Sequence, residues 1–323
     1  MKTQTAYKHP LRVALLAGGK SGEREVSLAG ATEVEKALDP KKYQVKRYDP
    51  AIDMARIAHE SGDIDVVFIL LHGRFGEDGT VQGFLDLLGL PYQGSGVLGS
   101  ALAMDKDAAK TLYQVHGLPV SPWRMARQDD AVDPRQLLAE LSLPLVVKPV
   151  RQGSSLGMSI AHTPEELAVA IAKAFTFDRE VMVEQYVQGR EITVGVIGND
   201  DLTALPLVEI IPGEGHPFFD YQAKYQAGAS REICPAQVSE SIRILAQKYA
   251  IRAHRALKLK GYSRTDMIIT DSRLVVLETN TIPGMTPTSL LPQAAAVAGL
   301  SFSALLDRLV ELALEEGVQG ANT

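Results

Sequence analysis

Three side chains that carry oxygen ligands lie in two neighbouring apolar segments near the C-terminal end of the sequence. Asp266 belongs to the segment 264–270, and Glu278 and Asn280 belong to the segment 274–280. A short polar turn joins the segments and predicts a β-hairpin with Asp266 opposite Glu278 to within one residue, and with Glu278 and Asn280 on one face. Oxygen ligands without histidine or cysteine are typical of Mg²⁺ held together with substrate phosphates. The alternative is a solvated strand face with polar side chains.

A lysine and a loop of small residues follow another apolar run. Lys148 stands between the run 143–147 and Pro149, and the loop 153–157 reads Gly-Ser-Ser-Leu-Gly. Small residues let backbone N–H groups approach a polyphosphate, and the lysine supplies a positive charge. The spacing of a Walker A motif is absent. The segment therefore indicates a phosphate site of another type or, alternatively, a surface turn beside an ordinary lysine.

Glu23 and His72 each follow a segment typical of a strand. The residues 18–23, Gly-Gly-Lys-Ser-Gly-Glu, lie where a strand passes into a helix, but they lack the glycine spacing of a dinucleotide-binding turn. The helix N-terminus there could bind a carboxylate, and Glu23 either interacts with the helix dipole or anchors a substrate amine. His72 ends a strand at the sheet edge where open α/β proteins bind ligands, and is either structural or functional.

Alternating strand and helix patterns in the first third of the chain position these residues. Apolar segments predict strands at 13–17, 43–48 and 66–71, and periodic segments predict helices at 27–38 and 80–88. This rhythm predicts an α/β fold whose N-terminal part, to about residue 105, is a parallel, doubly wound sheet.

The middle of the chain changes character, and the strands at the start of the last third, 191–197 and 202–211, read as antiparallel. Besides the hairpin, the patterns predict helices at 104–117, 164–175, 239–257 and 304–316, and strands at 143–149, 181–187, 191–197 and 202–211. The polar stretch 212–230 has no clear period, which is typical of a functional or a disordered loop.

Composition narrows the class of protein. The 323 residues, 46% of them hydrophobic, are too many for one comfortable core and predict two or three domains. The formal net charge is −6, and acidic and basic residues are mixed along the chain, so the sequence does not predict binding to nucleic acid or to an anionic membrane. The first apolar run is too short for a signal peptide or a spanning helix, and the lone Cys234 excludes an internal disulfide. We therefore expect a cytoplasmic protein.

Four motifs, taken jointly and in order, resemble the D-alanine–D-alanine ligase family. They are GGKSGEREVS at 18–27, LHGRFGEDG at 71–79, VKP with GSSLGM at 147–158, and ETNTIPGMT at 278–286. The resemblance covers nearly the whole chain. It implies a three-domain ATP-grasp fold, α/β with α+β character in its C-terminal part. The domains would span 1–105 (substrate), 106–190 (central ATP-grasp) and 191–323 (C-terminal ATP-grasp and metal).

The resemblance also implies a reaction. ATP would phosphorylate the carboxylate of one D-alanine, and the amine of a second D-alanine would attack the acyl phosphate, for peptidoglycan precursor synthesis. Two Mg²⁺ or Mn²⁺ ions and basic groups would neutralise the moving phosphoryl group. Members of this family are usually homodimers, so a homodimer is expected.

The roles of individual residues follow from the resemblance, position by position. The metal ligands would be Asp266, Glu278 and Asn280. The ATP-binding residues would be Lys106, Lys148, Ser155 and Lys224 around the phosphates and Glu184, Val187 and Glu191 around adenine and ribose. Glu23 would hold the ammonium of the first substrate, linked by hydrogen bonds to Ser154 and Tyr225. Arg264 and Gly284 would form the oxyanion hole, and His72 and Ser289 would bind substrate, Ser289 the second carboxylate.

The sequence departs from the family pattern at three places, and three rival interpretations compete with it. One departure, Pro287-Thr288 before Ser289, lies within the variation expected of the family. Gln185 replaces a frequent lysine and puts one adenine hydrogen bond in doubt, whereas Thr265 should point to the face opposite Asp266 and have little effect. An NAD-dependent dehydrogenase lacks support because the glycine spacing is missing. A non-catalytic ATP-binding protein should have lost one of the hairpin residues. A D-alanine–D-lactate ligase is the nearest rival, and Tyr225 favours the dipeptide product.

Overall fold

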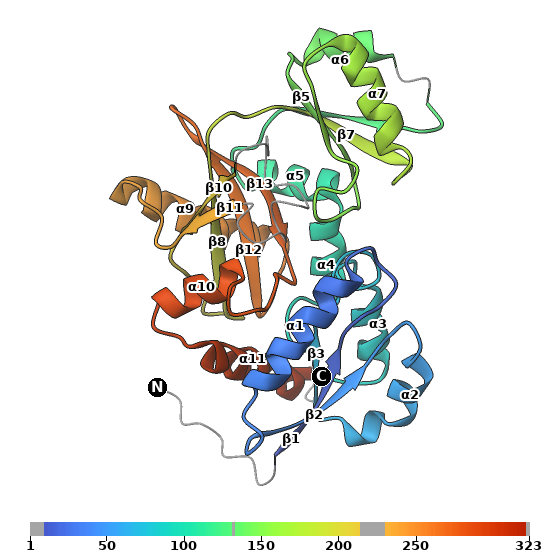
Figure 1. The fold of residues 1–323 in the computed structure, drawn as a ribbon, viewed down its shortest axis with the longest axis vertical. Coiled ribbons are helices and arrows are strands. Elements are labelled where there is room, and N and C mark those ends of the chain that lie inside the picture. The colour runs from blue at the N-terminus through green and yellow to red at the C-terminus, as the bar shows by residue number, and fades with distance from the viewer. Residues whose placement is uncertain (1–9, 131–132, 214–229, 321–323) are drawn as a thin grey trace.

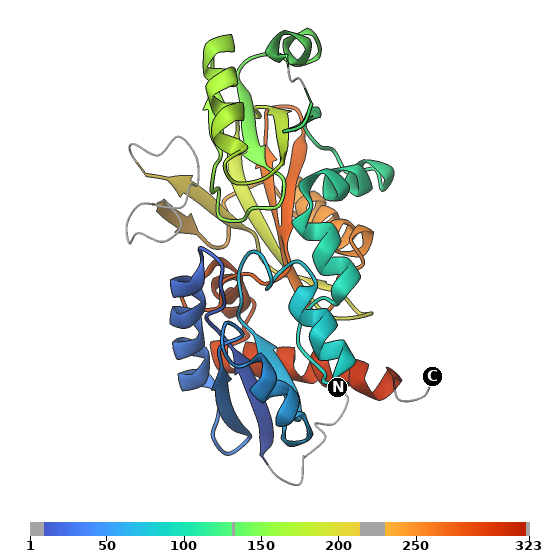
Figure 2. The ribbon, with the colours of Figure 1, turned by 90° about the vertical axis from the view of Figure 1, so that its right-hand side faces the viewer.

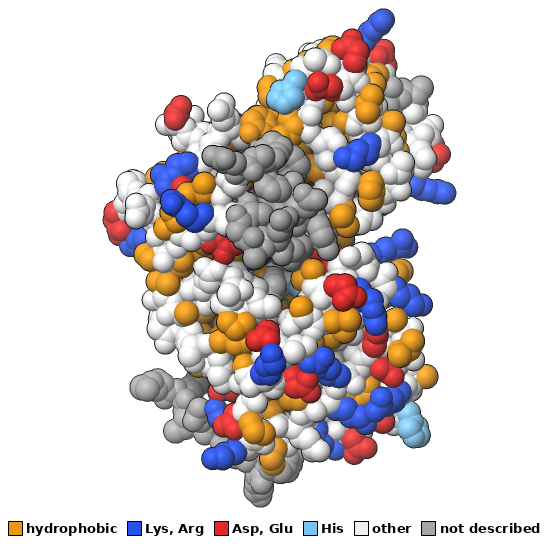
Figure 3. All heavy atoms as spheres, in the orientation of Figure 1, with side chains coloured by type: hydrophobic (Ala, Val, Ile, Leu, Met, Phe, Trp, Pro, Cys, Tyr) orange, Lys and Arg blue, Asp and Glu red, His pale blue; other side chains and the backbone are white. Residues whose placement is uncertain are grey.

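The computed structural model describes residues 10–130, 133–213 and 230–320, which fold around three β-sheets (Figure 1). The N-terminal sheet is blue in Figure 1, the second sheet green, and the third runs from yellow to orange between them. On the face seen in Figure 3, acidic and basic side chains are interspersed. None of the described helices is both long and apolar enough to cross a membrane.

The N-terminal sheet is parallel, with strand order β2-β1-β3. Its strands are β1 (Leu11–Leu16), β2 (Tyr43–Tyr48) and β3 (Val66–Ile69), extended by a bridge between Val67 and Tyr92. Alternate residues of β1 enter two different cores, as the two-residue repeat of a strand requires. Helices α1 (Arg24–Ala37) and α11 (Phe302–Gly320) cover one face, and α2 (Met54–His59) and α3 (Thr80–Leu87) cover the other (Figure 2). The predicted doubly wound sheet is confirmed.

The second sheet is antiparallel, with strand order β4-β7-β5-β6. Its strands are β4 (Trp123–Arg127), β5 (Leu145–Pro149), β6 (Ser159–Ala161) and β7 (Glu180–Gln185). Helices α6 (Pro134–Glu140) and α7 (Pro164–Ala174) bury their apolar faces in the same core as the sheet. The predicted start of α7 is confirmed, because the Thr163 side chain accepts from the Glu166 amide and proline takes the first helical position.

The third sheet is antiparallel, with strand order β11-β10-β8-β12-β13, and it carries the predicted hairpin. Its strands are β8 (Arg190–Ile197), β10 (Val208–Pro212), β11 (Ser230–Ile233), β12 (Tyr262–Ile269) and β13 (Leu274–Asn280), and β9 (Thr203–Ala204) pairs with β8. Helices α9 (Glu240–Ala256) and α5 (Lys106–Val115) pack in one core with this sheet, and α10 (Leu290–Val297) packs against β8. The three sheets follow the order of the three predicted domains, whose boundaries remain a prediction.

The helix expected at 104–117 is present as α5, which begins at Lys106 because Asp105 has an extended backbone and its carboxylate caps the helix at the Ala108 amide. The helix before it, α4 (Val97–Met104), was not predicted. The strand expected at 202–211 is β9 and β10, because Pro206 between them cannot donate to a ladder.

Buried hydroxyl groups connect α5 to the hairpin. The Tyr113 hydroxyl donates to Thr279 Oγ1 at 2.7 Å, and Thr279 Oγ1 lies 3.0 Å from Thr265 Oγ1. The three side chains are buried on the face opposite Asp266, so the predicted orientation of Thr265 is confirmed. Each hydroxyl satisfies its neighbour in a region without solvent.

We predict that Tyr113→Phe lowers the free energy of unfolding by about 1–3 kcal/mol, because the buried Thr279 hydroxyl loses its donor. Urea denaturation measures the change. Tyr92→Phe is the matched control: its hydroxyl bonds Asp86 at the surface, and its loss should cost less than about 0.5 kcal/mol. Equal effects of the two substitutions would contradict the account of the buried network.

Candidate active site

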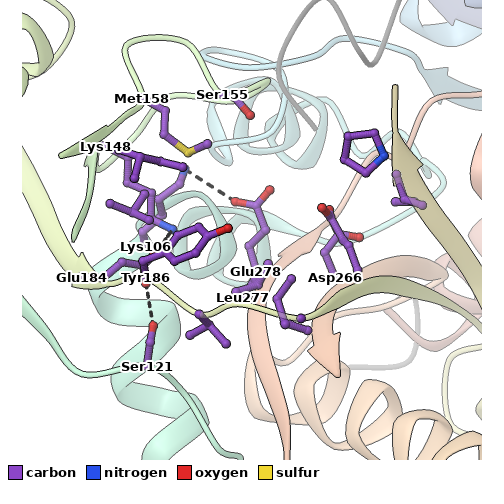
Figure 4. A pocket seen from close by; sticks show the side chains of 18 of the residues that line it. Lys106, Ser121, Lys148, Ser155, Met158, Glu184, Tyr186, Asp266, Leu277 and Glu278 are labelled. Carbon is purple, nitrogen blue, oxygen red and sulfur yellow. Dashed lines mark hydrogen bonds and ion pairs between the residues drawn. The ribbon is translucent and has the colours of Figure 1, made fainter. Parts of the chain in front are cut away.

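A cavity of about 510 Å³ lies between the second and third sheets (Figure 4). Strands β5 and β7 and the loop after β5 line it from one side, and β8, β10, β12 and β13 line it from the other. The predicted site residues among its lining are Lys106, Lys148, Ser154, Ser155, Glu184, Val187, Glu191, Asp266 and Glu278. The structure therefore brings together in one cavity the lysines and the carboxylates that the sequence singled out separately.

Two lysines point toward the hairpin carboxylates. Lys106 Nζ donates to the Gln152 carbonyl at 2.7 Å and lies 3.9 Å from Glu278 Oε2. Lys148 forms an ion pair with Glu184. Burial alone would lower the pKa of Lys148, but the charges of Glu184 and Glu278 outweigh it and raise that pKa. Both lysines therefore present positive charge to whatever enters the cavity.

Glu184 lies in a buried cluster that the sequence reasoning missed. Its carboxylate pairs with Lys110 as well as Lys148 and accepts from the Ser121 hydroxyl at 2.9 Å. Burial would raise the pKa of Glu184, but the two lysines outweigh it and lower that pKa strongly. The available signal was the four-residue spacing of Lys106 and Lys110, which puts both on one side of α5.

The hairpin places Asp266 directly opposite Glu278, as predicted, and a bulge follows Asp266. The Asp266 carboxylate is held by donors within the protein. Arg264 donates to both oxygens at 2.9 Å, Asn280 Nδ2 donates at 3.1 Å, and the Thr193 hydroxyl donates at 2.5 Å. Thr193 was not predicted; it could have been inferred only from the pairing of β8 with β12.

The oxygen atoms on this face of the hairpin are suited to binding a hard divalent cation. Asp266 and Glu278 offer carboxylate oxygens to the cavity, and Asn280 places an amide beside Asp266. Among the described residues, three or more histidine, cysteine, aspartate or glutamate side chains do not converge on one point. A metal ion here would be bound by the two carboxylates, by the amide and by oxygens of the bound ligand. Arg264 would have to move away from Asp266.

Glu23, at the N-terminal end of α1, and Ser154, in the loop after β5, meet at the edge of this cavity. The Ser154 hydroxyl donates to the buried Glu23 carboxylate, so this predicted link is confirmed. The backbone of Gly153 approaches so closely that a β-carbon there would lie 3.0 Å from Glu23 Oε2, and one on Gly73, which has φ of +70°, would lie 2.9 Å from it. A side chain at either position would therefore displace the Glu23 carboxylate, and the positive φ of Gly73 further favours glycine there.

His72 and Glu77 lie beside Glu23. Burial lowers the pKa of His72, although the charge of Glu23 opposes this shift. Burial and the Glu23 charge together raise the pKa of Glu77 to about 8, and its carboxyl accepts from the Gly73 amide at 2.7 Å. Glu77 was missed, and its place in the motif after His72 was the available signal. A neutral histidine and a protonatable carboxyl thus accompany one carboxylate.

The other predicted residues that the structure describes are not among the cavity lining; they are Glu23, His72, Arg264, Asn280, Gly284 and Ser289. Gly284 and Ser289 are neighbours, since a β-carbon on Gly284 would lie 3.1 Å from Ser289 Oγ, and that oxygen accepts from the Thr286 amide at 3.1 Å. Arg264 is turned toward Asp266. Lys224 and Tyr225 lie outside the described residues.

Two family models match the sequence. The model of the D-ala D-ala ligase N-terminus matches residues 49–95, and that of the D-ala D-ala ligase C-terminus matches residues 112–311. A D-alanine–D-alanine ligase of Desulfotalea psychrophila is 59% identical over 318 residues, 98% of each chain. One of Syntrophobacter fumaroxidans is 59% identical over 306 residues, 95% of this chain and 98% of the relative.

Solved structures agree with the sequence comparison. A D-alanine–D-alanine ligase from Bacillus anthracis complexed with ATP superposes with a TM-score of 0.85 at 32% identity, covering 96% of this chain and 99% of that chain. A D-Ala:D-Ser ligase from Enterococcus faecalis superposes with a TM-score of 0.83 at 33% identity, covering 94% and 100%. The fold is the ATP-grasp fold that the resemblance implied. By its sequence and its structure, the chain belongs to the D-alanine–D-alanine ligase family.

Proposed function

We propose that this protein joins two D-alanine molecules into D-alanyl-D-alanine, with conversion of ATP to ADP and phosphate, for peptidoglycan precursor synthesis. The observation that carries the proposal is the single cavity in which Lys106 and Lys148 face Asp266 and Glu278. Positive groups and oxygen ligands in one place are what phosphoryl transfer to a carboxylate requires. The family and the ATP complex of the Bacillus anthracis ligase support it.

The first step places a phosphoryl group on the first D-alanine. Its carboxylate oxygen attacks the γ-phosphorus of ATP, and ADP leaves. Lys106 and Lys148, with Lys224 and Ser155, bind the phosphates, while Glu184, Val187 and Glu191 bind adenine and ribose. A carboxylate is a poor electrophile, and conversion to an acyl phosphate provides a good leaving group.

The second step forms the peptide bond. The neutral amine of the second D-alanine attacks the acyl carbon, phosphate leaves, and the amine nitrogen loses a proton. Arg264 and Gly284 stabilise the negative charge on the tetrahedral intermediate, and Ser289 binds the second carboxylate. Arg264 must leave Asp266 for this role.

Glu23 holds the first substrate. Its buried carboxylate binds the ammonium group by a charge-assisted hydrogen bond, and the Ser154 hydroxyl, with Tyr225, keeps that carboxylate in position. His72, beside Glu23 and uncharged because of its lowered pKa, contacts the substrate without repelling the ammonium.

Asp266, Glu278 and Asn280 would hold two Mg²⁺ or Mn²⁺ ions with the nucleotide. The bound ions would neutralise charge on the phosphates. The two carboxylates, which lie opposite each other on paired strands, support this assignment.

We also propose a homodimer in the cytoplasm. Exposed apolar side chains of α3 and α4, namely Leu87, Val97 and Leu98, offer a surface for a second copy. The use of ATP and a sequence with one cysteine fit the cytoplasm.

The alternative is a ligase that takes another second substrate. The D-Ala:D-Ser ligase with the same fold shows that this architecture serves more than one acceptor, and D-lactate is the other candidate. Tyr225 favours D-alanine.

Product identification tests the proposal. With ATP, Mg²⁺ and D-alanine alone, the protein should release ADP and form D-alanyl-D-alanine. With D-lactate or D-serine added at equal concentration, mass spectrometry should find the dipeptide of D-alanine as the main product at neutral pH. A depsipeptide or D-alanyl-D-serine as the main product would establish the alternative instead.

A substitution tests the metal assignment. We predict that Glu278→Gln lowers the rate of ADP release by about 100-fold or more, because a neutral amide replaces a carboxylate that faces the phosphates. Circular dichroism should show an unchanged fold. Asp271→Asn, which makes the same change in the exposed turn of the same hairpin, is the control and should keep wild-type turnover. Near-normal turnover of Glu278→Gln at saturating Mg²⁺ would contradict the assignment of Glu278 as a metal ligand.

A further inference from the structure

Lys110 is a fully buried lysine for which the reaction described above has no use. Only 1% of its side chain is exposed, and it does not line the nucleotide cavity. Its Nζ pairs with Glu184, donates to Ser121 Oγ at 2.8 Å and lies 5.0 Å from the centre of the Trp123 ring. Burying a lysine is costly unless its charge is compensated, so this position requires an explanation.

The two oxygens of Glu184 have different partners. Oε2 is held by Lys110, which is buried and does not line the cavity, and by the Ser121 hydroxyl, which does line it. Oε1 pairs with Lys148, which does line the cavity. The counter-ion of Oε2, Lys110, therefore does not line the cavity, whereas the counter-ion of Oε1, Lys148, does.

The charge balance of this cluster depends on Lys110. Lys110, Glu184 and Lys148 together carry one net positive charge, which Lys148 presents to the cavity. If Lys110 were absent, Glu184 and Lys148 would form an ion pair with no net charge. Separating that pair to let Lys148 approach a phosphate would leave a buried carboxylate without a counter-ion, which is strongly unfavourable.

We propose that Lys110 is a positioning residue for the nucleotide: as the permanent counter-ion of Glu184, it frees Lys148 to bind the phosphates. The inference rests on the proposed function in that the cavity binds ATP. When Lys148 turns to the phosphates, Lys110 and Ser121 keep the Glu184 carboxylate satisfied at Oε2, and Oε1 becomes available to a donor on the nucleotide.

The test compares ADP with adenosine, which lacks phosphates. Isothermal titration calorimetry gives the ratio of the dissociation constant of adenosine to that of ADP, and this ratio reports the contribution of the phosphates alone. In Lys110→Met, which keeps the length and apolar part of the side chain, the ratio should fall about tenfold or more relative to wild type. Lys36→Met, which removes an exposed lysine on α1, is the control and should keep the wild-type ratio.

A second substitution separates positioning from packing. In Lys110→Met/Glu184→Gln no buried carboxylate retains Lys148, so the ratio should recover to within about threefold of wild type even if adenine binding weakens. A purely structural role of Lys110 predicts equal losses for both ligands and no recovery. An unchanged ratio in Lys110→Met, or no recovery in the double variant, would overturn the proposal.

Two precautions keep the test decisive. Should Lys110→Met fail to fold, Ser121→Ala replaces it, with an expected fall of about two- to threefold in the ratio, and an unchanged ratio there would contradict the proposal. Dipeptide synthesis by the wild-type protein is measured separately. Its absence would count against the ligase function alone, whereas the two dissociation constants test Lys110 independently.

Discussion

The hydrogen bond from Ser154 to Glu23 connects parts of the molecule that fold around different sheets. Glu23 lies just before α1 of the N-terminal sheet, and Ser154 lies in the loop after β5, which lines the nucleotide cavity. Through this contact the carboxylate proposed to bind the first substrate stands at the edge of the cavity that holds the lysines. A phosphoryl group can be transferred only between atoms held a few ångströms apart, so the proposed reaction depends on this junction.

The charged groups of the site satisfy one another in the structure. Asp266 accepts from Arg264, Asn280 and Thr193, and Glu184 accepts from two lysines and Ser121. Both carboxylates are thereby buried with partners, which an isolated buried charge could not be. In the proposed reaction each carboxylate exchanges one partner for a metal ion or nucleotide. The protein therefore avoids leaving charges uncompensated while the ligands are absent.

Local patterns predicted much of this fold. The strand 43–48 has the predicted bounds, and the hairpin has the predicted pairing of Asp266 with Glu278. These features depend on short-range periodicity and on one turn. The link between Glu23 and Ser154 came from the family resemblance, because the two residues are 131 positions apart.

The features that were missed depend on tertiary structure. A lysine on a helix is normally exposed, so its spacing from Lys106 indicated only that the two lysines share one side of α5. The burial of Lys110 depends on β7, which places Glu184 beside it. The pKa of Glu77 is raised because its carboxyl is buried and because the Glu23 carboxylate, distant in the sequence, lies near it, and local sequence shows neither property. Helix α4 was missed because its eight residues are almost all apolar or small, so they show no amphipathic period.

The central claim is that the carboxylate of D-alanine, in this composite site, attacks ATP to form an acyl phosphate. The direct measurement uses D-alanine labelled with ¹⁸O in its carboxyl group, together with ATP and Mg²⁺, and analyses the released phosphate by mass spectrometry. The account predicts that each phosphate carries one ¹⁸O atom from the substrate, in step with dipeptide formation. Dipeptide formation with unlabelled phosphate would contradict it.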